Sequence, residues 1–231
     1  MLGKDSRFIE GFALGMWQAN CYIIGDVEEG GAVVVDPGQD GAPVVRERLA
    51  ARQVRCEAIL LTHGHIDHIW AVPELARELH VPVLLHTADR YLWEDPAKAF
   101  GDLPARALQA QLGLDWQPPE GALEGLRDEQ TLTFAGIRFL VRHTPGHTPG
   151  SSVFLVSDTG EDDPLLVSGD LVFAGSVGRT DFPRGSWQEE MDSIARVVLR
   201  LADRTVIVPG HGRETTVGAE RAGNPFLREL V

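Results

Sequence analysis

Short runs of apolar residues, separated by polar turns, divide the chain into many strands and a few helices. Continuous apolar stretches of this length are typical of strands that are buried on both faces. They predict strands at residues 8–9, 20–24, 32–35, 57–61, 81–85, 131–134, 137–141, 165–168 and 205–208. Apolar residues with helical spacing predict helices at residues 43–53, 66–79 and 187–201. This mixture of elements indicates a protein of the α/β or α+β class.

The stretch at about 87–130 differs from the rest of the chain in composition and periodicity. It is rich in Ala, Leu, Pro and Trp, and it shows only a short helical pattern around residues 105–112. Because it is too short and too irregular to form its own core, we interpret residues 1–231 as one domain with a helical or loop insertion at about 87–130. We expect Trp93 and Trp116 to pack this insertion onto the main body rather than to wall a substrate pocket.

The composition is ordinary for a soluble globular protein, with 231 residues, 43% hydrophobic and 24% charged. A formal net charge of -13 argues against nucleic acid or an anionic membrane as a partner. No stretch approaches the ~20 apolar residues of a membrane span, and the N-terminal residues lack a secretory pattern. A cytoplasmic location is therefore expected. Cys21 and Cys56 are expected to be reduced core residues rather than catalytic thiols.

The segment 62–68, Thr-His-Gly-His-Ile-Asp-His, concentrates metal-binding side chains between a predicted strand and a predicted helix. These are His63, His65, Asp67 and His68. Imidazoles this close would repel one another if protonated, whereas a divalent cation gives each lone pair a partner. A surface histidine cluster is the weaker alternative, because solvation alone does not require Asp67 between the imidazoles. The segment therefore predicts a metal site.

Three further candidate ligands, His147, Asp170 and His211, each follow a buried strand. Pro and Gly on both sides of His147 indicate an irregular backbone that directs one side chain. The histidines at 80, 86 and 143 are expected to make local hydrogen bonds instead. Asp36, before Pro37 and Gly38, is interpreted either as a turn former or as an acceptor that orients the metal loop.

The seven candidate ligands divide into two sets, one for each of two divalent ions. His63, His65 and His147 form one set, Asp67, His68 and His211 form the other, and Asp170 lies between them. Ions roughly 3.5–4 Å apart would hold a bridging water and lower its pKa toward about 7. The absence of a thiolate ligand favours open, hydrolytic chemistry, with Asp67 and Asp170 as catalytic candidates. Zinc is the expected metal, and iron or manganese are the alternatives.

The motif Thr-His-x-His-x-Asp-His, with His147, Asp170 and His211, resembles the metallo-β-lactamase superfamily. This resemblance implies an αββα four-layer sandwich of two mixed β-sheets flanked by helices, with the metal site at one edge. Segments 144–151, 169–183 and 209–226 are similar to the small members of the glyoxalase II group. They imply that a bridging hydroxide hydrolyses a hydroxyacyl thioester, such as S-lactoylglutathione or the ester of a related thiol. The residues after His211 contain no counterpart of the helical domain that holds glutathione in longer glyoxalase II enzymes.

Two points remain open after this comparison. Persulfide dioxygenases also resemble the chain, including Gly-Arg-Thr-Asp-Phe at 178–182, and would use a single iron held by His63, His147 and Asp170. The Gly-His-Gly sequence at 210–212 favours the hydrolases. Arg179 is interpreted either as a substrate contact or as the partner of Asp181 in an ion pair. The oligomeric state is not predicted.

Overall fold

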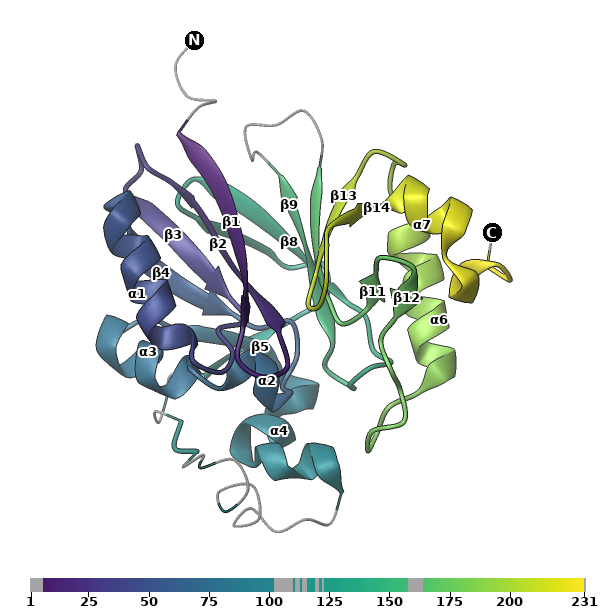
Figure 1. Cartoon of the computed structure of the whole chain (residues 1–231), viewed down its shortest axis with the longest axis horizontal. Coiled ribbons are helices and arrows are strands. Elements are labelled where there is room, and N and C mark those ends of the chain that lie inside the picture. Colours follow the sequence, from purple (N-terminus) through teal and green to yellow (C-terminus); the bar gives the residue numbers. More distant parts are fainter. Residues whose placement is uncertain are drawn as a thin grey trace.

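Two six-stranded sheets pack face to face in the computed structural model, and helices cover their outer faces (Figure 1). The structure describes residues 6–101, 110, 113, 116–118, 121, 123–157 and 164–230. Helices α1 and α3 cover the first sheet, and helices α6 and α7 cover the second (Figure 1). The predicted αββα sandwich is therefore confirmed.

The N-terminal part of the chain forms the first sheet. Its strands, in spatial order, are β1 (Arg7–Leu14), β2 (Ala19–Asp26), β3 (Gly31–Val35), β4 (Arg55–Leu60), β5 (Val83–His86) and β6 (Leu123–Leu126). The first three strands are antiparallel, and β3 to β6 are parallel. Parallel neighbours need crossover connections, which here contain α1 (Gly41–Arg52), α2 (Ile66–Ile69) and α3 (Val72–Leu79).

The second sheet is also mixed. Its strands, in spatial order, are β14 (Thr215–Thr216), β13 (Val206–Pro209), β10 (Leu165–Gly169), β9 (Ser152–Ser157), β8 (Ile137–His143) and β7 (Thr131–Phe134). A small hairpin, β11 (Val172–Phe173) and β12 (Ser176–Val177), follows β10. The remaining elements are α6 (Trp187–Arg196), η3 (Val198–Arg200), α7 (Val217–Gly223) and η4 (Pro225–Leu227). Among these strands only β10 and β13 are parallel neighbours.

Alternation along the strands sends apolar side chains to two different layers. In β3, Val33 and Val35 face the second sheet, while Ala32 and Val34 pack under the helices. Phe139 and Phe154 of the second sheet pack in the same layer as Val33 and Val35, and both are fully buried. Burial of such a side chain stabilises the fold by roughly 1.5–3 kcal/mol. This central layer fixes the positions of the strand ends that carry the candidate ligands.

Two predicted helices are interrupted. Residues 66–79 form α2 and α3 rather than one helix, because Pro73, in the first turn of α3, has no amide hydrogen with which to continue a preceding helix. The amide of Ala71, between the two, donates to the carbonyl of Pro37. Residues 187–201 form α6 followed by the separate turn η3.

The stretch predicted as an insertion is partly integrated into the fold. Residues 87–100 form η1 (Thr87–Asp89), α4 (Arg90–Glu94) and η2 (Pro96–Phe100), whereas β6 extends the first sheet, which the loop interpretation missed. The helical pattern expected around 105–112 lies outside the described residues, apart from residue 110. Trp93 is buried, and the indole N–H of Trp116 donates to its carbonyl at 2.6 Å. Trp93 belongs to the apolar core between the first sheet and its helices, and Trp116 packs against that core, so the two tryptophans pack the stretch onto the main body, as expected.

Cys21 and Cys56 are unpaired. Burial raises the pKa of Cys21 well above its ordinary value and that of Cys56 to about 12, so neither thiol is activated. Within the described ranges, no helix has both the length and the apolar character needed to span a bilayer.

Candidate metal centre

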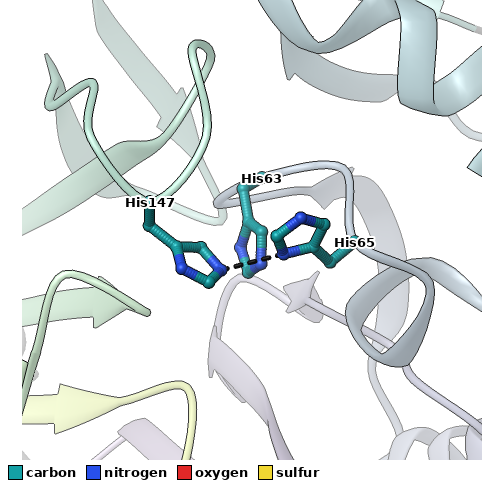
Figure 2. Close-up of side chains that lie close together, drawn as sticks. All are labelled: His63, His65 and His147. Atoms are coloured by element: carbon teal, nitrogen blue, oxygen red, sulfur yellow. Dashed lines mark hydrogen bonds between the residues drawn. The ribbon is translucent and has the colours of Figure 1, made fainter. Parts of the chain in front are cut away.

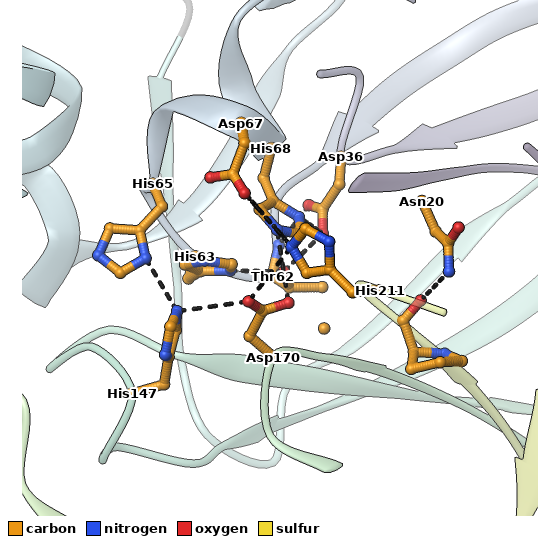
Figure 3. Close-up of polar contacts among 12 residues, drawn as sticks. Asn20, Asp36, Thr62, His63, His65, Asp67, His68, His147, Asp170 and His211 are labelled. Carbon is orange, nitrogen blue, oxygen red and sulfur yellow. Dashed lines mark hydrogen bonds and ion pairs between the residues drawn. The ribbon is translucent and has the colours of Figure 1, made fainter. Parts of the chain in front are cut away.

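The seven candidate ligands meet at one edge of the sandwich, where loops from both sheets converge (Figure 3). The first sheet contributes His63 and His65 after β4 and Asp67 and His68 on α2. The second sheet contributes His147 from the β8–β9 loop, Asp170 after β10 and His211 after β13. Because β4, β10 and β13 all end at this edge, residues far apart in the sequence become neighbours.

Three imidazoles, those of His63, His65 and His147, form the first group (Figure 2). One ring nitrogen from each lies within 4.8 Å of the others. Nδ1 of His65 is 2.8 Å from Nε2 of His147, and all three side chains are buried. Three converging nitrogen atoms are a donor set typical of a zinc or iron site.

Asp67, His68 and His211 form the second group. The Nε2 atoms of the two imidazoles are 3.3 Å apart. Oδ2 of Asp67 is 3.6 Å from Nε2 of His68 and 3.3 Å from Nε2 of His211. This group combines two nitrogen donors with one carboxylate.

Asp170 lies between the two groups (Figure 3). Its Oδ2 is 3.6 Å from Nε2 of His147 and 3.6 Å from Nε2 of His211, and its Oδ1 is 3.4 Å from Nε2 of His68. Gly210 permits this approach, because a Cβ atom there would lie 2.1 Å from Oδ1 of Asp170. One carboxylate can therefore reach ions in both groups.

Hydrogen bonds outside the cluster determine which nitrogen of an imidazole is free. The hydroxyl of Thr62 donates to Oδ2 of Asp36 at 2.6 Å, so it accepts from Nδ1 of His63 at 3.0 Å. Nδ1 of His147 donates to the carbonyl of Arg179 at 2.7 Å. In both rings Nε2 is left unprotonated and directed into the cluster, as metal ligation requires.

Asp36 follows β3 with a φ of 50°, in the left-handed region, and no turn is assigned at residues 36–38. Its carboxylate accepts from the amide of Thr62 at 2.8 Å and lies 3.1 Å from Nδ1 of His68. The side chain of Asp36 thus contacts the loop after β4 and a ligand on α2.

The donor set fits divalent ions. Nε2 of His63 and Oδ1 of Asp170 are buried and have no hydrogen-bond partner among the described residues. Burial, reinforced by neighbouring imidazoles, keeps the pKa values of His63 and His65 well below their ordinary range. A buried ring nitrogen that is neutral and has no hydrogen-bond partner suits a metal ligand. The cluster is accordingly a metal-binding site of histidine and aspartate.

The second group is electrostatically different from the first. Burial opposes a charge on His68, but Asp67 and Asp170 outweigh it and raise the pKa of His68 to about 10. Burial likewise opposes ionisation of Asp67, yet His68 and His211 hold its pKa well below the ordinary range. These carboxylates attract positive charge, which a divalent cation would supply.

Asp89, which the sequence reasoning missed, connects the two loops of the first group. Its carboxylate is fully buried and accepts from the amide of Gly64 at 2.9 Å, the hydroxyl of Thr148 at 2.7 Å and the amide of Gly150 at 2.7 Å. Gly64 separates His63 from His65, and Thr148 follows His147. No local pattern around Asp89 indicates this role.

Glu190 on α6 holds the same region from the other side. It is fully buried, and its Oε2 accepts from the amide of His147 at 2.7 Å. Burial raises the pKa of Glu190 to about 9, so the side chain is neutral at pH 7. One signal was present in the sequence, since helical spacing places Glu190 on the same face as Ile194.

The loop of His211 is held by β2. The side-chain amide of Asn20 donates to the carbonyls of Pro209 at 2.8 Å and Gly212 at 2.9 Å. The hydroxyl of Tyr22 also donates to the Pro209 carbonyl, at 2.7 Å. The first sheet thereby positions a ligand of the second.

The three remaining histidines lie outside the cluster. Nδ1 of His80 donates to the carbonyl of Glu78, and Nε2 of His143 donates to that of Pro149. His86 stacks on His143 with ring centroids 3.9 Å apart and accepts from the amide of Ala88. These are the local hydrogen bonds expected from the sequence.

A cavity of about 390 Å³ opens onto the metal-binding cluster. Its walls are formed by Trp17, Ile66, Ala99, Phe100, Phe173, Val177, Arg179 and Phe182, together with the ligands His65, Asp67, His147, Asp170 and His211. The sequence reasoning identified none of the aromatic wall residues. They come from separate turns and short elements, which show no periodic pattern.

Arg179 lines this cavity and also forms the ion pair with Asp181. Its Nε and Nη2 atoms donate to the two carboxylate oxygens at 2.7 Å each. The guanidinium lies 4.3 Å above the ring centroid of Phe182. Both groups of the pair are exposed to solvent, so the pair contributes little to stability.

The fold and the metal-binding cluster together are those of the metallo-hydrolase superfamily. The sequence pattern of the Metallo-beta-lactamase superfamily matches residues 14–211, and the chain belongs to this superfamily.

Several relatives extend the comparison. The chain is 34% identical over 223 residues to the hydroxyacylglutathione hydrolase GloC of Haemophilus influenzae, covering 95% of this chain and 97% of GloC. It is 37% identical to the structure of BLEG-1, described as a B3 metallo-beta-lactamase, with a TM-score of 0.83 and coverage of 96% and 100%. It is also 37% identical to TTHA1623 in a di-iron-bound form, with a TM-score of 0.76 and coverage of 94% and 100%.

Proposed function

We propose that this protein hydrolyses a hydroxyacyl thioester, with S-lactoylglutathione or the ester of a related thiol as its substrate. The observation that carries the proposal is the position of Asp170, within 3.6 Å of ring nitrogens from both ligand groups. Such an arrangement suits two divalent ions, with zinc expected and iron or manganese as alternatives. Two bound ions would lower the pKa of a water toward about 7 and polarise the substrate carbonyl.

The residues of the chain have distinct parts in this reaction. His63, His65 and His147 are the imidazole ligands of the first group, and hydrogen bonds to Thr62 and to the Arg179 carbonyl hold the rings of His63 and His147 in one orientation. Burial keeps the pKa values of His63 and His65 well below their ordinary range. Asp67 and Asp170 are the carboxylates that line the cavity, so they can accept a hydrogen bond or a proton from the attacking water. The leaving thiolate needs no general acid, because a thiol has a pKa of about 8.5.

Two comparisons support the proposal and its metal alternatives. GloC, described as a hydroxyacylglutathione hydrolase, aligns over nearly its whole length. The di-iron form of TTHA1623 supports iron as a possible metal. A second candidate, hydrolysis of a β-lactam amide, is favoured by the 37% identity to BLEG-1.

The test uses one purified protein loaded separately with zinc, iron and manganese. Thiol release from S-lactoylglutathione is measured beside opening of a chromogenic cephalosporin and oxygen uptake on glutathione persulfide. We expect thiol release without oxygen consumption, at a kcat/KM well above that for the cephalosporin. Preferred cleavage of the cephalosporin would establish the second candidate. Rapid oxygen uptake by the iron form, with no thiol released, would replace the hydrolase with a persulfide dioxygenase.

A further inference from the structure

Apolar side chains form the cavity wall beyond the metal-binding cluster. Among the described residues that line it, the polar side chains are five candidate ligands and Arg179. The other seven lining residues are apolar or aromatic. A substrate whose carbonyl reaches the cluster therefore meets mainly apolar surface among the described residues around it.

Aromatic rings adjoin both ligand groups. The ring centroid of Phe182 is 5.3 Å from that of His65 and 6.0 Å from that of Phe100. This part of the wall therefore runs from the first ligand group toward the surface. Phe100 at its outer end is 38% exposed. On the other side, the ring of Phe173 is 6.1 Å from that of His211.

The cation of the wall is already paired. Nε and Nη2 of Arg179 each donate to a carboxylate oxygen of Asp181 at 2.7 Å. The plane of the guanidinium lies over the ring of Phe182. The pair carries no net charge, and an added anion would meet Asp181 as well as Arg179. A net charge of -13 also disfavours approach by anions.

We propose that the cavity selects thioesters whose thiol is uncharged and apolar, in preference to those of glutathione. This inference rests on the proposed thioester hydrolysis. Glutathione carries two carboxylates and an ammonium group, and burying such charges without partners costs free energy. An apolar thiol would instead gain from contact with Phe100 and Phe182.

The first experiment keeps the lactoyl group constant and varies the thiol. S-lactoyl esters of glutathione, N-acetylcysteamine and 2-phenylethanethiol are compared by kcat/KM. We expect the phenylethanethiol ester to exceed the glutathione ester by about tenfold or more, the equivalent of at least one buried aromatic contact. A glutathione ester that is cleaved as well or better overturns the inference while leaving thioester hydrolysis intact.

Binding measurements decide the inference even if no thioester is cleaved, a result that would overturn the proposed function alone. Titration calorimetry compares the non-hydrolysable thioethers S-methylglutathione and methyl phenethyl sulfide, using the zinc-loaded protein. Tighter binding of the uncharged thioether supports the inference. Equal or tighter binding of S-methylglutathione overturns it.

A charge introduced into the wall gives a second test. Phe100→Arg should shift the ratio of kcat/KM values toward the glutathione ester by about tenfold, because it adds an unpaired cation at the outer end of the wall. Val27→Arg is the matched control, since Val27 is 46% exposed on the turn between β2 and β3 and does not line the cavity. A ratio that changes equally in both variants, or in neither, contradicts the assignment of this wall to the thiol.

Discussion

Replacing Asp89 with alanine should loosen both loops that carry the first ligand group. The carboxylate is 0% exposed, and it accepts hydrogen bonds from Gly64, Thr148 and Gly150. Alanine leaves two buried amides, those of Gly64 and Gly150, without this acceptor. The hydroxyl of Thr148 retains Ser151 as a partner at 2.8 Å.

The magnitude follows from the two orphaned amides. Each buried donor left unsatisfied costs about 1–3 kcal/mol, which gives an upper range of about 2–6 kcal/mol. Burial raises the pKa of Asp89, which shows that its charged form is poorly solvated in the folded state. Removing the carboxylate relieves this cost and offsets part of the loss of stability. We expect the free energy of unfolding to fall by about 2–4 kcal/mol. Metal affinity should fall by about 10–100-fold, as for other residues that orient ligands.

Urea unfolding with chelator present measures the first effect, and competition with a chromophoric chelator measures the second. Asp95→Ala is the control, because Asp95 lies in the same segment and its carboxylate accepts from the amide of Ala97 at 3.1 Å, with no hydrogen bond to either ligand loop among the described residues. It should cost about 1 kcal/mol as a helix cap and leave metal affinity unchanged. Wild-type stability and metal affinity in Asp89→Ala would refute this account of how the loops are held.

Three further predictions concern the metal centre and its surroundings. Elemental analysis of protein reloaded with zinc, iron or manganese should approach two ions per chain; saturation at one would remove the binuclear assignment. Asp170→Ala should lower thiol release by at least about a hundredfold, whereas Cys21→Ala and Cys56→Ala should stay near wild type; a folded, metal-loaded cysteine variant without activity would contradict this. Because burial raises the pKa of Glu190 from 4.5 to about 9, the folded state retains a proton that the unfolded state loses, so stability falls as pH rises between these values. Glu190→Gln should remove that part of the pH dependence, and urea midpoints at pH 6 and pH 8.5 that shift equally in both proteins would show that Glu190 is already ionised.

The ligand set could be predicted because its signal is local. Four ligands fall within residues 63–68, and the others follow runs that read as buried strands. In an α/β fold the ends of parallel strands meet at one edge, which places Asp170 after β10 beside His211 after β13. Their approach to residues 63–68 depends on the packing of the two sheets, because β4 lies in the other sheet. The structure brings all seven side chains together.

The cavity wall could not be predicted in the same way. Phe100 and Phe182 are far apart in the sequence, and each lies in an irregular segment with no periodicity to indicate its direction. Their contact depends on how η2 packs against the loop before α6. Similarly, β6 is too short and too polar to be recognised as a strand until β5 provides its partner.

Polar residues outside the cluster explain how mutually repelling ligands are kept together. Asp36 holds the segment after β4, Asp89 connects the loops of His63 and His147, and Glu190 accepts from the amide of His147. Tyr22 holds the strand end before His211. Each of these hydrogen bonds joins two protein groups, so together they oppose the repulsion among closely placed ligands and set the direction of each ligand loop.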